Sequence, residues 1–239
     1  MTTDVGDLGT VLGVWAHPDD ETYLSAGLMA AAVRNGQRVV CLTATRGEKG
    51  SWDEERWPSE TMGAVREKEL EECMRVLGVD EHHWLDYIDA ECTGVDREEA
   101  IARIARFVDE VQPDAVLTFG PEGMTDHADH KAVSGWATDA FQRAAKPGAR
   151  LYYATQSPEW AAKWVPILNQ FNVFEGDTPP ITPHDQMGID FRLPDDILDL
   201  KVKAVLAHDS QIDGMRSVFG SEFIRESQYG EWFRLAATR

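Results

Sequence analysis

The chain has 239 residues, of which 43% are hydrophobic, so it is long enough to bury a full core as one large domain. Lys and Arg number 23 against 42 Asp and Glu, and the formal charge of −19 argues against nucleic acid or an anionic membrane surface as a partner. The three cysteines are far apart and fit buried thiols in a reducing compartment, and no apolar run approaches the roughly 20 residues that span a bilayer. We therefore expect a cytoplasmic protein without membrane insertion, folded as a single domain over 1–239.

The first predicted elements are a strand and a helix with an acidic turn between them. Val11–Trp15 is apolar and is typical of a buried strand, and residues 24–32 place leucine and alanine at the i, i+4, i+7 and i+8 spacing of a buried helix face. The turn between them, Ala16–Glu21, holds a histidine and three carboxylates. A strand followed so early by a helix predicts a sheet of βαβ units, whose ligands lie beyond the carboxyl ends of the strands.

The rest of the chain continues this alternation. Further strands are expected at Arg38–Thr45, His83–Ile88, Asp114–Gly120, Arg150–Thr155 and, as an edge strand, Ile189–Leu193; further helices are expected at Ser59–Leu77, Arg97–Val111, Asp129–Ala145 and Asp195–His208. Five prolines and four aromatic residues between Ser157 and Pro183 predict irregular structure, a flap over about 157–185. Together these elements predict an α/β fold with a Rossmann-like, mostly parallel sheet and helices on both faces.

A second polar cluster, Asp126–His130, follows the predicted Asp114–Gly120 strand and its loop. It therefore returns to the same end of the sheet as the first acidic turn. A catalytic zinc takes three nitrogen or oxygen ligands and leaves one position open for water. A histidine and a carboxylate from one loop, with a histidine from the other, would supply such a set and leave further groups for proton transfer.

Three motifs of the sequence resemble the PIG-L/LmbE family of zinc-dependent N-acetylglucosaminide deacetylases. The strand-ending A-H-P-D-D-E is complete at Ala16–Glu21, H-x-D-H is complete at His127–His130, and K-x-x-A-x-x-x-H-x-S-Q stands at Lys201–Gln211. A weaker T-R-G-E element stands at Thr45–Glu48. The resemblance extends over about residues 11–211. It implies an LmbE-like fold, a possible homo-oligomer, and hydrolysis of the N-acyl, most often N-acetyl, amide of a small-molecule amino sugar or its conjugate.

Carried over by position, the resemblance implies that His17, Asp20 and His130 bind Zn2+, or another divalent metal in its place. It also implies that Asp19 is the general base that takes a proton from the attacking water. Neighbouring side chains in an extended turn diverge, so one aspartate is able to face the metal while the other reaches the water. Glu21, at the start of the helix, is expected to cap it or to support the ligands rather than to bind the metal.

On the leaving-group side, the resemblance implies that His127 stabilises the oxyanion or protonates the departing amine. Because a histidine held by a carboxylate is a suitable proton donor, Asp129 is expected to orient His127. Thr125 stands where several members of the family have a tyrosine that helps the oxyanion, so His127 and the metal are left to do this alone. The candidates for substrate binding, by resemblance and by nearness to strand ends, are Arg46, Glu48, Arg66 and Asp89.

Two other functions remain open at this point. One keeps the metal and changes the bond, as in an amidase that acts on a thiol-sugar conjugate or another amide. The other is a non-catalytic module that binds a sugar or a nucleotide. The turn after the first strand argues against a nucleotide, because G-x-G-x-x-G is absent and an acidic turn in its place would repel a pyrophosphate.

Overall fold

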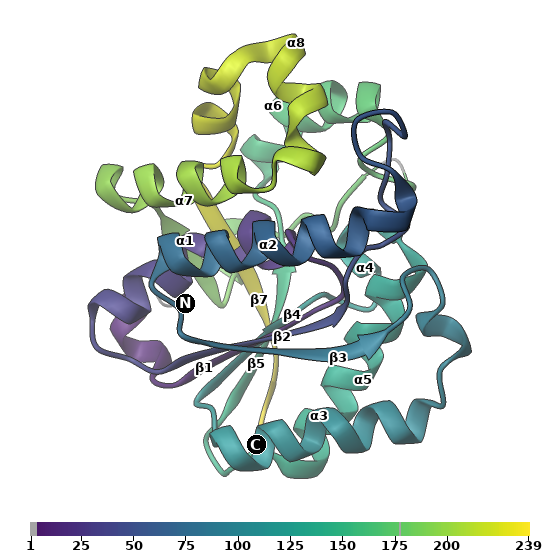
Figure 1. Cartoon of the computed structure of the whole chain (residues 1–239). Coiled ribbons are helices and arrows are strands. Elements are labelled where there is room, and N and C mark those ends of the chain that lie inside the picture. The colour runs from purple at the N-terminus through teal and green to yellow at the C-terminus, as the bar shows by residue number, and fades with distance from the viewer. Residues whose placement is uncertain (1–3, 177) are drawn as a thin grey trace.

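The computed structural model describes residues 4–176 and 178–239, and these form a seven-stranded, mostly parallel sheet (Figure 1). The strand order is β3-β2-β1-β4-β5-β7-β6, with β1 at Val11–Trp15, β2 at Val39–Thr45, β3 at Glu81–Tyr87, β4 at Ala115–Thr118, β5 at Arg150–Thr155, β6 at Ile189–Arg192 and β7 at Gly230–Thr238. Strands β1 to β5 pair in parallel, whereas β7 is antiparallel to β5 and β6. The predicted Rossmann-like α/β fold is confirmed.

Helices cover both faces of the sheet (Figure 1). On one side lie α1 (Asp20–Arg34), α2 (Ser59–Leu77) and α7 (Asp195–Ala207), and on the other α3 (Arg97–Val111) and α5 (Ala128–Ala144). The helices α6 (Pro158–Leu168) and α8 (Asp209–Ser227) lie together beyond α7 and extend the molecule past the sheet, and the one-turn helix α4 spans Gly123–Asp126. The short 3-10 turns are at Val5–Leu8, Cys92–Gly94, Asn169–Phe171 and His184–Gln186.

The central strands position the candidate site. Every residue of β1, β2 and β4 is buried, as expected for parallel strands with helices on both faces. The chain runs outward from β1 to β2 and β3, then returns to the other side of β1 with β4. This reversal leaves a crevice at the carboxyl ends of β1 and β4, the usual ligand position in such a sheet. Both polar clusters of the sequence follow these two strands.

The prediction of irregular structure at 157–185 is wrong for its first part, which is helix α6. Pro158 occupies the first turn, where a missing amide hydrogen costs little, and Ser157 Oγ accepts the Trp160 amide at 3.1 Å. Pro166 stands in the last turn of the helix. The aromatic side chains of α6 are buried in a second small core with Trp232 and Met187, and this burial outweighs the cost of the internal proline.

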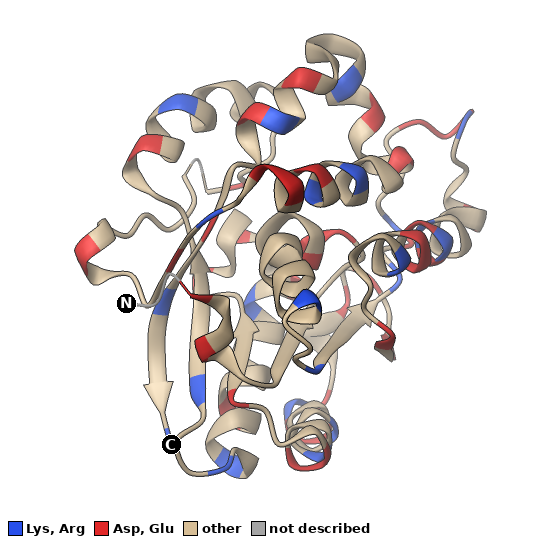
Figure 2. Cartoon of the chain, turned by 90° about the vertical axis from the view of Figure 1, so that its left-hand side faces the viewer, with Lys and Arg blue, Asp and Glu red and all other residues tan. Residues whose placement is uncertain are grey.

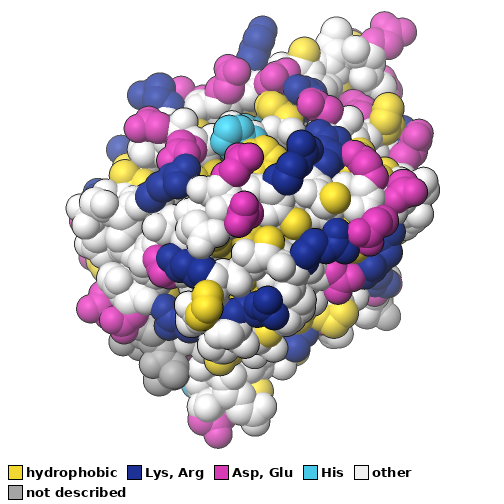
Figure 3. Space-filling model, turned by 90° about the horizontal axis from the view of Figure 1, so that it is seen from below, with side chains coloured by type: hydrophobic (Ala, Val, Ile, Leu, Met, Phe, Trp, Pro, Cys, Tyr) yellow, Lys and Arg dark blue, Asp and Glu magenta, His cyan; other side chains and the backbone are white. Residues whose placement is uncertain are grey.

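The carboxylates that give the net charge are spread over the surface. In Figure 2 Asp and Glu lie on several helices and loops beside Lys and Arg, and the face seen in Figure 3 shows the same mixture. Many of these groups form exposed ion pairs, for example Arg38 with Glu81 at 2.7 Å, and such pairs contribute little to stability. Among the described residues, no helix combines the length and the apolar character that crossing a membrane requires.

Candidate active site

The turn after β1 directs two adjacent aspartates to different partners. Asp19 has φ +118°, a conformation that few residues other than glycine adopt, and it precedes the first residue of α1. The backbone amides of residues 16 and 17 donate to Asp20 Oδ2 at 3.2 and 2.7 Å, which leaves Oδ1 free. The Asp19 carboxylate instead accepts a hydrogen bond from Arg66 Nη2 at 3.0 Å. Backbone strain of this kind, which costs about 1–3 kcal/mol, is concentrated at functional sites.

Three side chains with potential ligand atoms converge beyond the strand ends. His17 Nδ1 lies 3.1 Å from His130 Nε2, His130 Nε2 lies 3.3 Å from Asp20 Oδ1, and His17 Nδ1 lies 3.8 Å from Asp20 Oδ2. Ligands at tetrahedral positions about a zinc ion are separated by roughly 3.4 Å. The two histidines and the aspartate therefore fit a small divalent cation.

The outer hydrogen bonds of both histidines determine which nitrogen is free. His17 Nε2 lies 3.0 Å from Asp89 Oδ1 and 3.4 Å from Asp129 Oδ2, and His130 Nδ1 lies 2.9 Å from the Gly123 carbonyl. Because a carboxylate and a carbonyl only accept, each of these nitrogens carries a proton, and if both rings are neutral the two nitrogens that face one another both present lone pairs. Lone pairs only 3.1 Å apart repel unless a cation lies between them. A proton on His17 Nδ1 that donates to His130 Nε2, or a metal cation between the two nitrogens, would supply the positive charge that this contact favours.

The electrostatics of the two histidines agree with this assignment. Burial disfavours a charged His17, but the carboxylates of Asp129, Asp89 and Asp20 outweigh this effect and raise the pKa of His17 to about 10. Burial, with the nearby His17, holds the pKa of His130 well below its usual value, so that His130 stays neutral, the state in which an imidazole is able to bind a metal. The pocket thus favours added positive charge beside a neutral imidazole.

His127 joins the same group of rings but differs in its hydrogen bond. Its ring centroid lies 4.8 Å from that of His17 and 5.1 Å from that of His130. It is the residue before α5, and its Nδ1 accepts the Asp129 amide at 3.1 Å. A neutral ring whose Nδ1 accepts must carry its proton on Nε2. His127 therefore offers a donor rather than a lone pair.

The prediction that Asp129 orients His127 through its carboxylate is wrong. The Asp129 carboxylate accepts the amides of Ala90 and Cys92 at 2.7 and 3.2 Å and faces His17. Successive side chains at the start of a helix point in different directions, so the backbone amide of Asp129, and not its side chain, reaches His127. The Asp129 carboxylate therefore links His17 to the loop after β3.

Glu21 and His208 lie behind the site and do not line it. Glu21 Oε2 accepts the Asp19 amide at 3.2 Å, so it caps the strained turn as expected. His208 is fully buried, and its Nε2 lies 3.0 Å from Thr22 Oγ1 and 3.6 Å from Glu21 Oε1. His208 packs beneath the start of α1 rather than at the rim.

The four predicted substrate-binding residues separate into two pairs. Asp89 and Arg66 are buried and line a cavity beside the histidines, where Asp89 holds His17 and Arg66 holds Asp19. Arg46 pairs with carboxylates of α2 and β3 and lies over the Trp84 ring, and Glu48 Oε1 accepts the Asp89 amide at 3.2 Å. Neither Arg46 nor Glu48 is among the residues that line the cavity.

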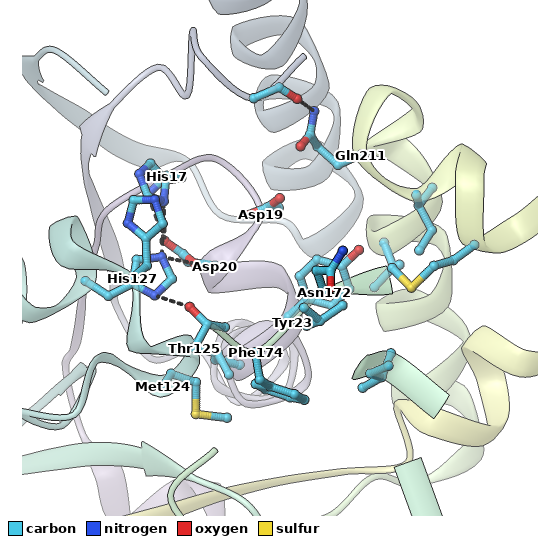
Figure 4. Close-up of a pocket in the computed structure, with 18 of the residues that line it drawn as sticks. His17, Asp19, Asp20, Tyr23, Met124, Thr125, His127, Asn172, Phe174 and Gln211 are labelled. Carbon is cyan, nitrogen blue, oxygen red and sulfur yellow. Dashed lines mark hydrogen bonds and ion pairs between the residues drawn. The ribbon is translucent and has the colours of Figure 1, made fainter. Parts of the chain in front are cut away.

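The cavity has a volume of about 510 Å³. In Figure 4 His17, Asp20 and His127 are grouped at one side of it, and Tyr23 and Phe174 lie toward the C-terminal helices. Sequence reasoning missed Tyr23, although it stands four residues after Asp19 and therefore on the same side of α1. Phe174 belongs to a segment between helices, where no local signal could have placed it.

Known proteins resemble this chain over most of its length. The 1D-myo-inositol 2-acetamido-2-deoxy-alpha-D-glucopyranoside deacetylase of Mycobacterium sp. (strain JLS) is 28% identical over 233 residues, which cover 84% of this chain and 74% of the relative. The enzyme of the same description from Saccharomonospora viridis is 29% identical over 232 residues, which cover 84% and 85%.

Solved structures resemble the fold as well. The N,N'-diacetylchitobiose deacetylase from Pyrococcus horikoshii superposes with a TM-score of 0.67 and 25% identity, covering 97% of this chain and 85% of that one. A deacetylase of the teicoplanin biosynthetic pathway shares the fold at a TM-score of 0.69 and 18% identity, covering 96% and 98%. Residues 12–141, more than half of the chain, match the family model PIG-L, described as GlcNAc-PI de-N-acetylase. The protein is a member of the PIG-L family.

Proposed function

We propose that this protein is an N-deacetylase that hydrolyses the N-acyl, most simply N-acetyl, amide of an amino sugar or its conjugate. The deacetylase relatives act on acetamido sugars, which supports this substrate class. The observation that carries the proposal is the pair of imidazole nitrogens 3.1 Å apart, with Asp20 beside them as a third ligand and the neighbouring Asp19 held by Arg66. Cation and base then stand together in one cavity.

The cation that fits this centre is divalent, and we assign zinc. His17 Nδ1, His130 Nε2 and Asp20 Oδ1 would hold it, since two imidazoles and a carboxylate are a typical set for a catalytic zinc. Asp89, Asp129 and the Gly123 carbonyl orient the two rings. When bound, such an ion supplies a Lewis acid that polarises the acyl carbonyl and makes water more acidic.

Asp19 is assigned as the general base. Burial raises the pKa of its carboxyl to about 6, although Arg66 opposes this rise. A base with a pKa near the working pH takes a proton effectively and is still ionised at neutrality. Asp19 lines the cavity, so it accepts the proton of the water that attacks the amide carbon.

His127 is assigned as the donor to the carbonyl oxygen. Its Nε2–H is free, because Nδ1 accepts the Asp129 amide, and the ring lines the cavity. Charge that develops on the carbonyl oxygen is stabilised by such a fixed donor. Adding a second proton at Nδ1 would break the bond from the Asp129 amide, so we assign the proton of the leaving amine to Asp19, which has just received one from water.

The test measures bound metal and acetate release from N-acetylglucosamine conjugates. Asp19→Ala is expected to keep the metal and to lose turnover by about 100-fold or more, since a general base contributes roughly 10²–10⁴-fold. Asp109→Ala, at an exposed position of α3, is the matched control and should behave as wild type. Unchanged turnover in Asp19→Ala would overturn the base assignment. A folded protein that never binds a divalent metal would overturn the proposed function.

A further inference from the structure

The cavity continues past the metal ligands into an apolar arm, which we define by Leu24, Leu168, Phe174, Ile212, Met215 and Phe223. Within the described ranges, the lining residues contributed by α6, α7 and α8 include no charged side chain. The charged lining residues come from the loops after the parallel strands, from the first turn of α1, from α2 and α5, and from residue 175. The cavity therefore has a polar reacting end and an uncharged far end.

Two polar side chains beside the arm, Trp160 and Ser227, are engaged in bonds within the protein. The cavity is also lined by Gln156, Asn172 and Gln228, and among the described residues Gln156 Oε1 is buried without a hydrogen-bond partner. Trp160 lines the cavity, but its Nε1–H donates to the Ser227 carbonyl at 2.7 Å, so the indole offers the cavity its ring alone. The Ser227 hydroxyl donates to the Ile224 carbonyl at 3.2 Å. A polyhydroxylated group in the arm would lose its hydrogen bonds to water and gain few from the protein, and hydroxyls without hydrogen-bond partners are costly to bury. An apolar group loses nothing by this transfer and gains from leaving water.

The arm is also continuous with the reacting end. In Figure 4 Tyr23, Asn172 and Phe174 lie between the histidine cluster and the C-terminal helices, so one molecule is able to span both regions. A pocket with a few convergent polar groups at one end and apolar walls at the other is typical of a site for an amphipathic small molecule.

We infer that the apolar arm binds an alkyl or aryl group of the substrate, so that the substrate class is an N-acylated amino sugar that carries an apolar substituent. This inference rests on the proposed function. The same chemistry is supplied by two sources, a long N-acyl chain or an apolar aglycone. The experiment below separates them.

Two series of compounds are compared with the zinc-loaded protein. The first keeps the N-acetyl group and lengthens the aglycone of a glucosaminide from methyl to butyl to octyl; the second keeps the methyl aglycone and lengthens the N-acyl chain from acetyl to butanoyl to octanoyl. In one series kcat/KM for amine release is expected to rise about fourfold for each of the first methylenes, the factor for moving a methylene out of water. The series that rises identifies the source.

Failure of this inference is distinguishable from failure of the proposed function. Hydrolysis of the methyl N-acetyl compound with no rise in either series would overturn the apolar arm alone. If no compound is hydrolysed, the proposed function is overturned. The dissociation constants of methyl and octyl glucoside, measured by calorimetry, then test whether the arm binds an apolar group. Equal dissociation constants for these two glucosides would overturn it, whereas tighter binding of the octyl compound would uphold it.

Substitutions in α8 give a matched comparison. Met215 lines the arm and is half-buried, whereas Val218, in the same helix, is exposed and does not line the cavity. Met215→Lys is expected to flatten the dependence of kcat/KM on chain length, and Met215→Leu is expected to keep it. Val218→Lys should retain both the wild-type rate and the chain-length dependence. A chain-length dependence that survives in a folded Met215→Lys protein would contradict the placement of the chain.

Discussion

His17 Nδ1 and His130 Nε2 lie 3.1 Å apart although 113 positions separate the two residues in the chain. Their approach depends on the parallel pairing of β1 with β4, in which Val11 lies opposite Ala115. The loops that follow these adjacent strands each supply one imidazole, and residues of other loops fix which nitrogen faces the centre. The metal affinity and the acid–base properties of the site should therefore also respond to residues other than the three proposed ligands.

Asp89 provides the first prediction. Asp89→Asn removes a charge from the outer nitrogen of His17 and should weaken metal binding by roughly 10- to 100-fold, the usual effect of losing such a partner. The measurement is a competitive titration with a metal-sensitive chelator. Asp86→Asn, near the end of β3 and paired with Arg46, is the control and should leave the affinity unchanged. Equal affinities in both variants would contradict the role given to Asp89.

The second prediction tests whether His127 is a metal ligand or a hydrogen-bond donor to the substrate. His127→Ala should keep the full metal content, because its free nitrogen carries a proton, while kcat falls by about 100- to 1,000-fold with the loss of an oxyanion donor. Metal content is measured by elemental analysis and kcat by amine release. His130→Ala is expected to lose the metal. If His127→Ala loses it as well, then His127 is a ligand and the hydrogen-bond argument fails.

The pH dependence reports on Asp19. Because burial raises its pKa to about 6, kcat/KM should fall as the pH drops through 6 and the base takes up a proton. Arg66 opposes this rise, so Arg66→Met should move the acidic limb upward by roughly 1–3 pH units, and Arg66→Lys by less. An acidic limb that stays at the same pH in Arg66→Met would show that another group controls it.

Lys201 and Glu231 form a fully buried ion pair that holds α1. Lys201 Nζ donates to Glu231 at 2.7 Å and to the Tyr23 carbonyl at 2.8 Å, and Glu231 accepts the amides of Gly27 and Leu28. Lys201→Met leaves a buried carboxylate unpaired and should lower the free energy of unfolding by about 3–5 kcal/mol.

Urea unfolding measures this change. Lys203→Met, at an exposed position of the same helix, should alter the free energy of unfolding by less than about 0.5 kcal/mol. The double substitution of Lys201→Met with Glu231→Gln removes the unpaired charge of Glu231 and should recover part of the lost free energy of unfolding. If Lys201→Met is as stable as Lys203→Met, the buried ion pair contributes no more to stability than an exposed ion pair does.

Much of the fold follows from local patterns. The predicted bounds of β1, α2 and α3 agree with the structure, because apolar runs, caps and glycine stops act within a few residues. Helix α8 and strand β7 were not predicted. Helix α8 contains a break at Gly220, and its few buried residues give a weak helical pattern. Strand β7 is buried only in its first half, so its apolar pattern is short and depends on its two neighbouring strands.

By itself, the sequence determined which residues follow β1 and β4, and it predicted from their types a metal-binding and acid–base set, because residue type and strand ends are local properties. Only the tertiary structure showed which group hydrogen-bonds each imidazole, and in particular that the Asp129 carboxylate contacts His17. It also showed that Arg46 pairs with Asp86 and does not line the cavity. The physical reason is that a tautomer depends on the group at the outer nitrogen, and that group arrives from a loop distant in sequence. The apolar arm likewise exists only where α6 and α8 meet the reacting end of the sheet.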